Sequence, residues 1–158
     1  MIPAMIVAHL REHHGGYEHH RHPSAPTAQE LAAAEHVSGY LVAKPVVVKL
    51  GGRLALAVVS AAERVNLGVL EEATGAAAEL VPETEFAGRF QPCEPGAEPA
   101  FSVFGVPIFV DEKFLHHAKL VMPAGTHEDS IVLDMKEWMR CENVQPIANL
   151  GAHPVERH

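Results

Sequence analysis

The chain has 158 residues, 47% of them hydrophobic, which is enough for one domain with a hydrophobic core and too apolar for a disordered chain. Its net charge of −8 argues against a wide nonspecific nucleic-acid surface, so DNA is not expected as a partner. No segment approaches the roughly 20 apolar residues of a membrane span. Cys93 and Cys141 lack CxxC spacing, which suits free thiols in a reducing cytoplasm, the location we expect.

The N-terminal third predicts two helices and a short strand. An amphipathic helix is expected over residues 3–13, ending at the glycine pair 15–16, and a strand over 17–22. Thr27 is followed three residues later by Glu30, which is the spacing of a capping box that opens a helix, here reaching about residue 37.

A lysine interrupts the apolar strand predicted next, over residues 39–50. Gly51 and Gly52 then form a two-residue hairpin turn into a strand over 53–59. Period-2 alternation places Lys44 on the same face as Val42, Val46 and Val48. Two interpretations are open: an edge-strand lysine that guards against aggregation, helped by Pro45, or a lysine held in a cleft for a function.

The remaining elements are short and alternate. Ser60 and Glu63 have capping-box spacing, as do Asp134 and Glu137. We expect helices over 67–73, 82–90 and 134–140, a helical turn over 111–115, strands over 78–81, 107–110, 119–122 and 130–133, a turn over 125–127, and a proline-rich loop over 91–101. The class is α+β, with one domain over 1–145, a mixed, mostly antiparallel sheet, and a weakly ordered tail over 146–158.

The histidines raise the question of a metal. Six of the twelve lie within residues 9–22, and imidazole suits zinc and nickel. However, no HExxH motif is present, and histidines at a helix C-terminus, such as His13 and His14, also interact favourably with the dipole. We therefore expect no metal and no cofactor. GxSxG, P-loop and GxGxxG motifs in strand–helix context are missing too, which disfavours a conventional serine or cysteine hydrolase.

Several short motifs, in their order and spacing, resemble the YbaK family, the prolyl-tRNA-synthetase-associated editing domain. The resemblance covers about residues 17–140. The matching segments are Thr27–Ala32, Val37–Gly39, Ala43-Lys44, Val46–Val48, Glu94–Ala97, Phe104–Asp111 and Ala124–His127. It implies a barrel-like sheet surrounded by short helices and the activity of a trans-acting aminoacyl-tRNA deacylase.

The resemblance also implies the site. Lys44 matches the family's essential lysine, and His127 matches a histidine near the amino-acid pocket of related editing domains. The implied substrate-binding residues are Gly96, Ala97, Pro99, Ala100, Phe101, Gly125, Thr126 and His127. Ala100 stands where such loops often have a second proline, and Glu98 adds a charge.

As a mechanism, we expect Lys44 to contact the ester or the terminal phosphate and to stabilise developing negative charge. The amides around Gly96 would cradle the aminoacyl group, and His127 would shape the pocket or orient water. A Schiff-base role for Lys44 ranks lower, because nothing else suggests a carbonyl substrate. Editing acts as a second sieve, which favours a small amino acid: alanine, serine, threonine or cysteine.

The expected partner is the acceptor end of aminoacyl-tRNA, contacted by a small basic set: Lys44, Lys49, Arg53 and Lys136. A synthetase or an elongation factor could recruit the acidic protein to tRNA. Two alternatives stay open. One is a non-catalytic module that binds aminoacyl-tRNA or a small ligand, and the other is a histidine-rich metal-binding protein.

Overall fold

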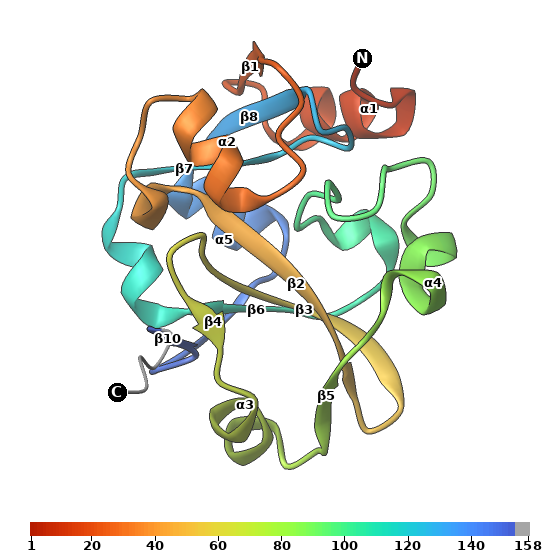
Figure 1. The fold of residues 1–158 in the computed structure, drawn as a ribbon, viewed down its shortest axis with the longest axis vertical. Helices are drawn as coiled ribbons and strands as arrows, with labels where there is room; N and C mark the ends of the chain where they lie inside the picture. Colours follow the sequence, from red (N-terminus) through yellow and green to blue (C-terminus); the bar gives the residue numbers. More distant parts are fainter. Residues whose placement is uncertain (154–158) are drawn as a thin grey trace.

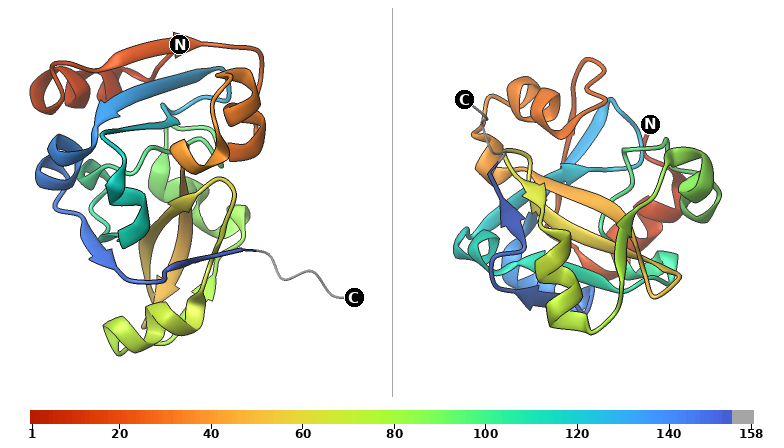
Figure 2. Two further views of the ribbon diagram at one scale, coloured as in Figure 1. Left: turned by 90° about the vertical axis from the view of Figure 1, so that its left-hand side faces the viewer. Right: turned by 60° about the horizontal axis from the view of Figure 1, so that its bottom comes forward.

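The computed structural model describes residues 1–153, and short helices alternate with strands throughout (Figures 1 and 2). The α-helices are α1 (Ala4–His13), α2 (Ala28–Ala34), α3 (Leu67–Thr74), α4 (Glu83–Phe86) and α5 (Met135–Cys141). The 3-10 helices are η1 (Gly39–Leu41), η2 (Ala87–Phe90), η3 (Ser102–Phe104) and η4 (Glu112–His116). The strands are β1 (Glu18–Arg21), β2 (Ala43–Leu50), β3 (Arg53–Ser60), β4 (Arg64–Val65), β5 (Ala78–Leu80), β6 (Ile108–Asp111), β7 (Lys119–Pro123), β8 (Asp129–Asp134), β9 (Gln145–Ile147) and β10 (Gly151–Ala152).

The largest sheet is built on the predicted hairpin. Its strand order is β5-β2-β3-β6-β9, with β2 antiparallel to both neighbours and β6 parallel to both of its own. Gly51 and Gly52 form the hairpin turn with φ of +56° and +85°, a left-handed conformation that costs glycine little and matches the twist of the flanking strands. The prediction of a mixed, mostly antiparallel arrangement is confirmed.

The strands do not close into the barrel-like arrangement that we expected. β1, β8 and β7 form a separate three-stranded antiparallel sheet, and β10 pairs with β4. Within residues 1–153, the only pairing recorded between the two larger sheets is an isolated bridge from Val42 to Val121. One bridge cannot continue a ladder around the molecule, so the sheets pack against each other instead of closing.

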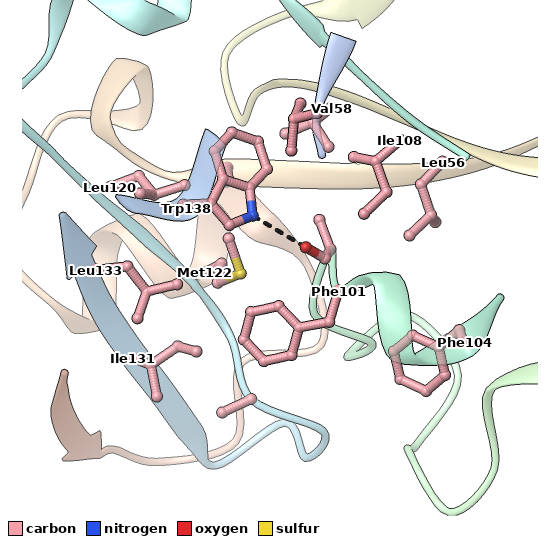
Figure 3. Packing of buried hydrophobic residues seen from close by; sticks show 14 of the residues in the cluster. Leu56, Val58, Phe101, Phe104, Ile108, Leu120, Met122, Ile131, Leu133 and Trp138 are labelled. Atoms are coloured by element: carbon pink, nitrogen blue, oxygen red, sulfur yellow. Dashed lines mark hydrogen bonds between the residues drawn. The ribbon is translucent and has the colours of Figure 1, made fainter. Parts of the chain in front are cut away.

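The main hydrophobic core lies between these two sheets (Figure 3). The five-stranded sheet and the three-stranded sheet contribute Leu56, Val58, Ile108, Leu120, Met122, Ile131 and Leu133. Trp138 of α5 is fully buried among them, and its Nε1–H donates to the carbonyl of Ala100 at 2.9 Å. This bond satisfies the indole's polar atom and holds the end of the proline-rich loop against the core.

Two of the three predicted capping boxes open helices. The side chain of Thr27 accepts from the amide of Glu30 at the start of α2, and that of Asp134 accepts from the amide of Glu137 at the start of α5. The Ser60–Glu63 box does not open a helix. Those residues form the turn between β3 and β4, and α3 begins later, capped by Asn66.

The segment that we assigned to a weakly ordered tail carries structure as far as residue 153. It contains most of β9 and the whole of β10. Leu150 between them is fully buried in a second hydrophobic cluster, behind β3 and α3. The burial of Leu150 and the pairing of β9 with β6 and of β10 with β4 explain the difference, because these contacts with distant residues leave no local pattern in the sequence. Residues 154–158 lie outside the described residues. No helix of residues 1–153 is long and apolar enough to cross a membrane.

Candidate functional site

A small pocket lies where the start of α2, the start of β2, the 91–101 loop and the turn after β7 meet. The space that the centre of a water molecule can occupy in it is about 40 Å3. The pocket therefore has room for only a few waters or a small chemical group. It is lined by Ala25, Thr27, Ala28, Leu31, Ala43, Lys44, Pro45, Gly96, Ala97, Pro123 and His127. Four of the predicted site residues, Lys44, Gly96, Ala97 and His127, therefore meet at one cavity.

Lys44 reaches the pocket from β2, on the face opposite the main core. Its neighbour Ala43 points into that core, so the alternation predicted for this strand is present. At Lys44 the strand pairs with β3 alone, because β5 covers only 48–50. Lys44 therefore lies at an edge of the sheet, as the interpretation of an edge-strand lysine that guards against aggregation requires. The side chain is nevertheless half-buried, and its ammonium donates a hydrogen bond to the backbone carbonyl of Glu63.

The electrostatic surroundings of Lys44 favour its neutral form more than water does. Burial lowers the pKa of Lys44, and the positive charge of Arg64 lowers it further, while the Glu63 carboxylate opposes the shift. An ammonium has three N–H donors. One is used by the carbonyl of Glu63, which leaves donors for a substrate in the pocket.

The Ser60–Glu63 turn fixes the carbonyl that holds Lys44. The hydroxyl of Ser60 donates to Glu63 Oε1 at 2.9 Å, and Lys113 Nζ donates to Oε2 at 2.7 Å. Glu63 is 5% exposed, and both of its carboxylate oxygens are satisfied. Ser60 and Glu63, whose spacing resembled a helix cap, thus help to position the side chain of Lys44.

Backbone hydrogen bonds join the proline-rich loop to the turn after β7. The amide of Glu94 donates to the carbonyl of Gly125 at 2.9 Å, and the amide of Gly125 donates to the carbonyl of Ala97 at 2.8 Å. The amide of His127 donates to Glu94 Oε1 at 2.8 Å, and its Nε2 donates to the carbonyl of Pro95 at 2.9 Å. With Nε2 as the donor, the neutral ring keeps Nδ1 as an acceptor.

Gly96 is required by backbone conformation rather than by space. Its φ is +86°, which L side chains rarely adopt, whereas a Cβ built there would have no neighbour closer than 3.7 Å. Its amide donates to Glu98 Oε2 at 3.1 Å, and the amide of Ala97 donates to the carbonyl of Glu94 at 2.9 Å. In this conformation the two amides that we expected to cradle the aminoacyl group are already paired within the loop.

Glu98 is a buried carboxyl directly behind the pocket, and sequence reasoning gave it no role. It is 2% exposed, and burial raises its pKa to about 7, with a further rise from the charge of Glu83 and a partial offset from backbone amides and His127. Burial and the charge of Glu98 in turn raise the pKa of Cys93 to about 12. That thiol stays protonated and is a poor nucleophile. The signal that could have marked Glu98 is a charged residue within the apolar end of the loop, between Ala97 and Phe101.

The other predicted site residues support the pocket instead of lining it. Ala100 and Phe101 are fully buried in the main core, and Pro99 is buried beside them. Gly125 braces the loop, and a Cβ on it would lie 2.7 Å from Pro3 Cδ. Thr126 donates its hydroxyl proton to Asp129 at 2.6 Å, which fixes the turn that carries His127.

Some lining residues were missed. They are Thr27, which caps α2, and Ala28 and Leu31 of α2 itself, in a segment used for the resemblance but given no role at the site. The remaining basic residues expected to contact tRNA lie away from the pocket. Lys49 follows Lys44 by five strand residues, about 17 Å at 3.3 Å each, and pairs with Glu85.

A larger groove of about 790 Å3 lies between α3 and residues 145–149, but Glu72 is the one charged residue among those that line it.

The family is established by comparison with known proteins. A model of the aminoacyl-tRNA editing domain matches residues 22–141. Because this span is well over half of the chain, the protein belongs to the aminoacyl-tRNA editing domain family, and the resemblance to the YbaK family is confirmed. A search of curated proteins finds no significant match.

Solved structures share the fold. A protein described as a candidate trans-editing enzyme for prolyl-tRNA synthetase superposes with a TM-score of 0.80 at 21% identity, over 92% of this chain and 94% of the other. The hypothetical protein APE2540 superposes with a TM-score of 0.81 at 18% identity, over 93% and 99% of the two chains. At these identities the likeness concerns the fold alone.

Proposed function

We propose that this protein is a trans-acting aminoacyl-tRNA deacylase that hydrolyses the ester between a small, wrongly attached amino acid and the 3′ end of tRNA. The observation that carries the proposal is the convergence of Lys44, Gly96, Ala97 and His127, from three chain segments, on one small pocket. Membership of the editing family supplies the reaction class. The pocket supplies the place where a 3′-aminoacyl group would sit.

In the proposed mechanism Lys44 supplies positive charge to the ester. As water attacks the carbonyl carbon, negative charge develops on the carbonyl oxygen, and a fixed ammonium stabilises it. His127, held through Nε2, keeps Nδ1 as the acceptor that orients the attacking water. A protein nucleophile is not needed, because the ester is already labile. The thiol of Cys93 in the 91–101 loop stays protonated and would be a poor nucleophile.

The size of the pocket supports a small amino acid. Four alanines line it, at positions 25, 28, 43 and 97, and its volume is about 40 Å3 by the measure above. A synthetase pocket separates amino acids that differ by one methyl group by only about 1–3 kcal/mol, so an editing site that admits the smaller residue improves fidelity. We propose alanine, serine, threonine and cysteine as the substrate set.

Recruitment to tRNA would rely on few positive charges. The net charge is −8, so contact with the acceptor end should be weak and salt-sensitive. A synthetase or an elongation factor would then deliver the substrate in the cytoplasm. The structural likeness to a candidate trans-editing enzyme for prolyl-tRNA synthetase makes that synthetase the first partner to test.

The test is a deacylation panel with tRNAs mischarged with alanine, serine, threonine or cysteine. Lys44→Ala should lower the best rate by about 10²–10³-fold, the usual effect of removing one such electrostatic contact. Lys119→Ala is the matched control, because it removes an exposed lysine of β7 that neither lines the pocket nor belongs to the basic set expected to contact tRNA, and it should leave the rate near that of the parent. Parental turnover by Lys44→Ala would refute the mechanism. Saturable binding without turnover by the parent protein would favour the binding module.

A further inference from the structure

The end of α1 and the last helix enclose a second polar cluster, away from the pocket. His14 follows α1 and is 1% exposed. Its Nε2 donates to Glu142 Oε2 at 2.5 Å, whereas its Nδ1 is buried and has no hydrogen-bond partner among residues 1–153. An unpaired buried nitrogen costs free energy unless something binds it, so His14 Nδ1 needs a partner.

Two residues of α5 carry ligand atoms close to His14. Glu137 Oε1 lies 3.8 Å from His14 Nδ1, and the Sγ of Cys141, one helical turn beyond Glu137, completes the group. The three residues' ligand atoms lie within 4.8 Å of one another. Around a tetrahedral zinc ion such atoms are separated by about 3.3–3.6 Å. Glu137 and Cys141 are only half-buried, so small rotations of their side chains can close the difference.

The hydrogen bond on the far side of His14 prepares Nδ1 for a metal. Because Nε2 carries the proton given to Glu142, the neutral imidazole has its lone pair on Nδ1. A ligating histidine in metalloproteins usually donates its other N–H to a carboxylate, which fixes the tautomer and the orientation of the ring. Glu142 holds that position here, and it is itself fixed by the amide and hydroxyl of Ser102 at 2.7 and 3.0 Å.

We propose that His14 Nδ1, Glu137 and Cys141 bind a zinc ion. One imidazole, one carboxylate and one thiolate are ligands that zinc accepts in tetrahedral sites. Binding converts the Cys141 thiol to a thiolate and releases its proton to solvent. It also replaces the bond that Cys141 Sγ donates to the carbonyl of His13 at 3.4 Å. The fourth position would be filled by water.

A neighbouring cluster is a weaker candidate. His9, His14 and Glu142 also bring their ligand atoms together. There, however, both imidazoles already donate to Glu142 Oε2, at 2.7 and 2.5 Å. A metal would have to break two buried hydrogen bonds at once, whereas at His14 Nδ1 it would satisfy an unpaired atom. Zinc at the proposed site would tie the end of α1 to α5, and none of its ligands lines the deacylase pocket.

Cobalt(II) provides the test, because a thiolate bound to cobalt gives a charge-transfer band that surface histidines cannot produce. The reduced, metal-free protein is titrated with cobalt, and zinc is then added in competition. We expect one equivalent of cobalt, a thiolate band, and displacement by zinc. Cys141→Ser should abolish the band, and Glu137→Gln should weaken binding at least tenfold. The matched controls Cys93→Ala, which removes the other thiol, and His13→Gln, which removes an adjacent exposed histidine, should keep the band.

Two results would overturn the proposal. The first is no thiolate band and no stoichiometric binding in the parent protein. The second is equal affinity in the parent and in Cys141→Ser, which would locate the metal elsewhere. Cys141 is a half-buried residue in the last turn of α5, so its serine variant should fold. Circular dichroism checks this, and the Glu137→Gln variant supplies an independent reading.

Discussion

Replacing Glu98 by glutamine tests whether the loop behind the pocket holds a carboxyl that is most stable when neutral. The pKa of Glu98 is about 7 in the folded protein, against a usual 4.5, chiefly because of burial. That difference, at about 1.4 kcal/mol for each pH unit, corresponds to about 3 kcal/mol of folding free energy. Because only 2% of Glu98 is exposed, solvent screening reduces this figure little.

The sign follows from the direction of the shift. A pKa raised by folding contributes stability that is fully present below pH 4.5 and is lost as the pH rises through 7. Glutamine cannot ionise, and its side-chain oxygen can accept a hydrogen bond from the Gly96 amide, as the carboxyl group of Glu98 does. The free energy of unfolding of Glu98→Gln, relative to the parent, should therefore rise by about 3 kcal/mol between about pH 4 and about pH 8.5.

Urea denaturation at a series of pH values measures this difference. Glu112→Gln serves as the control, because it removes an exposed carboxylate and should leave the pH dependence of the parent unchanged. The comparison is made across pH rather than at one pH, since a buried amide can change stability by a constant amount. Identical pH profiles for Glu98→Gln and the parent would refute the reasoning about burial.

Three further substitutions test the frame of the pocket. Gly125→Ala should lower the melting temperature strongly, because its Cβ would lie 2.7 Å from Pro3 Cδ at a φ of +95°. Gly96→Ala should cost about 1–2 kcal/mol, for its left-handed φ alone, and equal losses for the two variants in thermal denaturation would contradict this ranking. Burial alone would raise the pKa of Asp129, but hydrogen bonds from Thr126 and His19 lower it to about 2 from 3.8. Asp129→Asn should therefore lose about 2 kcal/mol near pH 7, with the gap to the parent closing as the pH falls through 2 in acid-denaturation curves.

Local signals in the sequence predicted the elements that depend on neighbouring residues. The glycine pair at 51–52 specified the hairpin, and Thr27 and Asp134 specified helix starts, because each acts on a backbone group within a few residues. Lys44 was found in the same way, as a charge that breaks an apolar alternation. The family resemblance added His127 and Gly96, which no local pattern distinguishes from an ordinary turn.

Features set by distant contacts could not be predicted. Ser60 and Glu63 have the spacing of a helix cap, yet they lie in a turn. There the Glu63 carboxylate accepts a hydrogen bond from Lys113, and the Glu63 carbonyl accepts one from Lys44. In the 91–101 loop no period indicates which side chains face inward, so Ala100 and Phe101 were assigned to the site although they belong to the core. Pairing of His14 with Glu142, 128 residues away, has no trace in local spacing either.

The paired amides of the loop make Lys44 the main source of positive charge at the pocket. With the amides of Gly96 and Ala97 already donating within the loop, an oxyanion there would depend on the ammonium. At an effective dielectric constant of about 20, two unit charges about 4 Å apart interact by about 4 kcal/mol. That equals the upper end of the loss, about 2.7–4 kcal/mol, that follows removal of one oxyanion-hole donor. A single half-buried lysine is therefore sufficient to account for the rate effect expected of Lys44→Ala, without a second electrostatic group in the pocket.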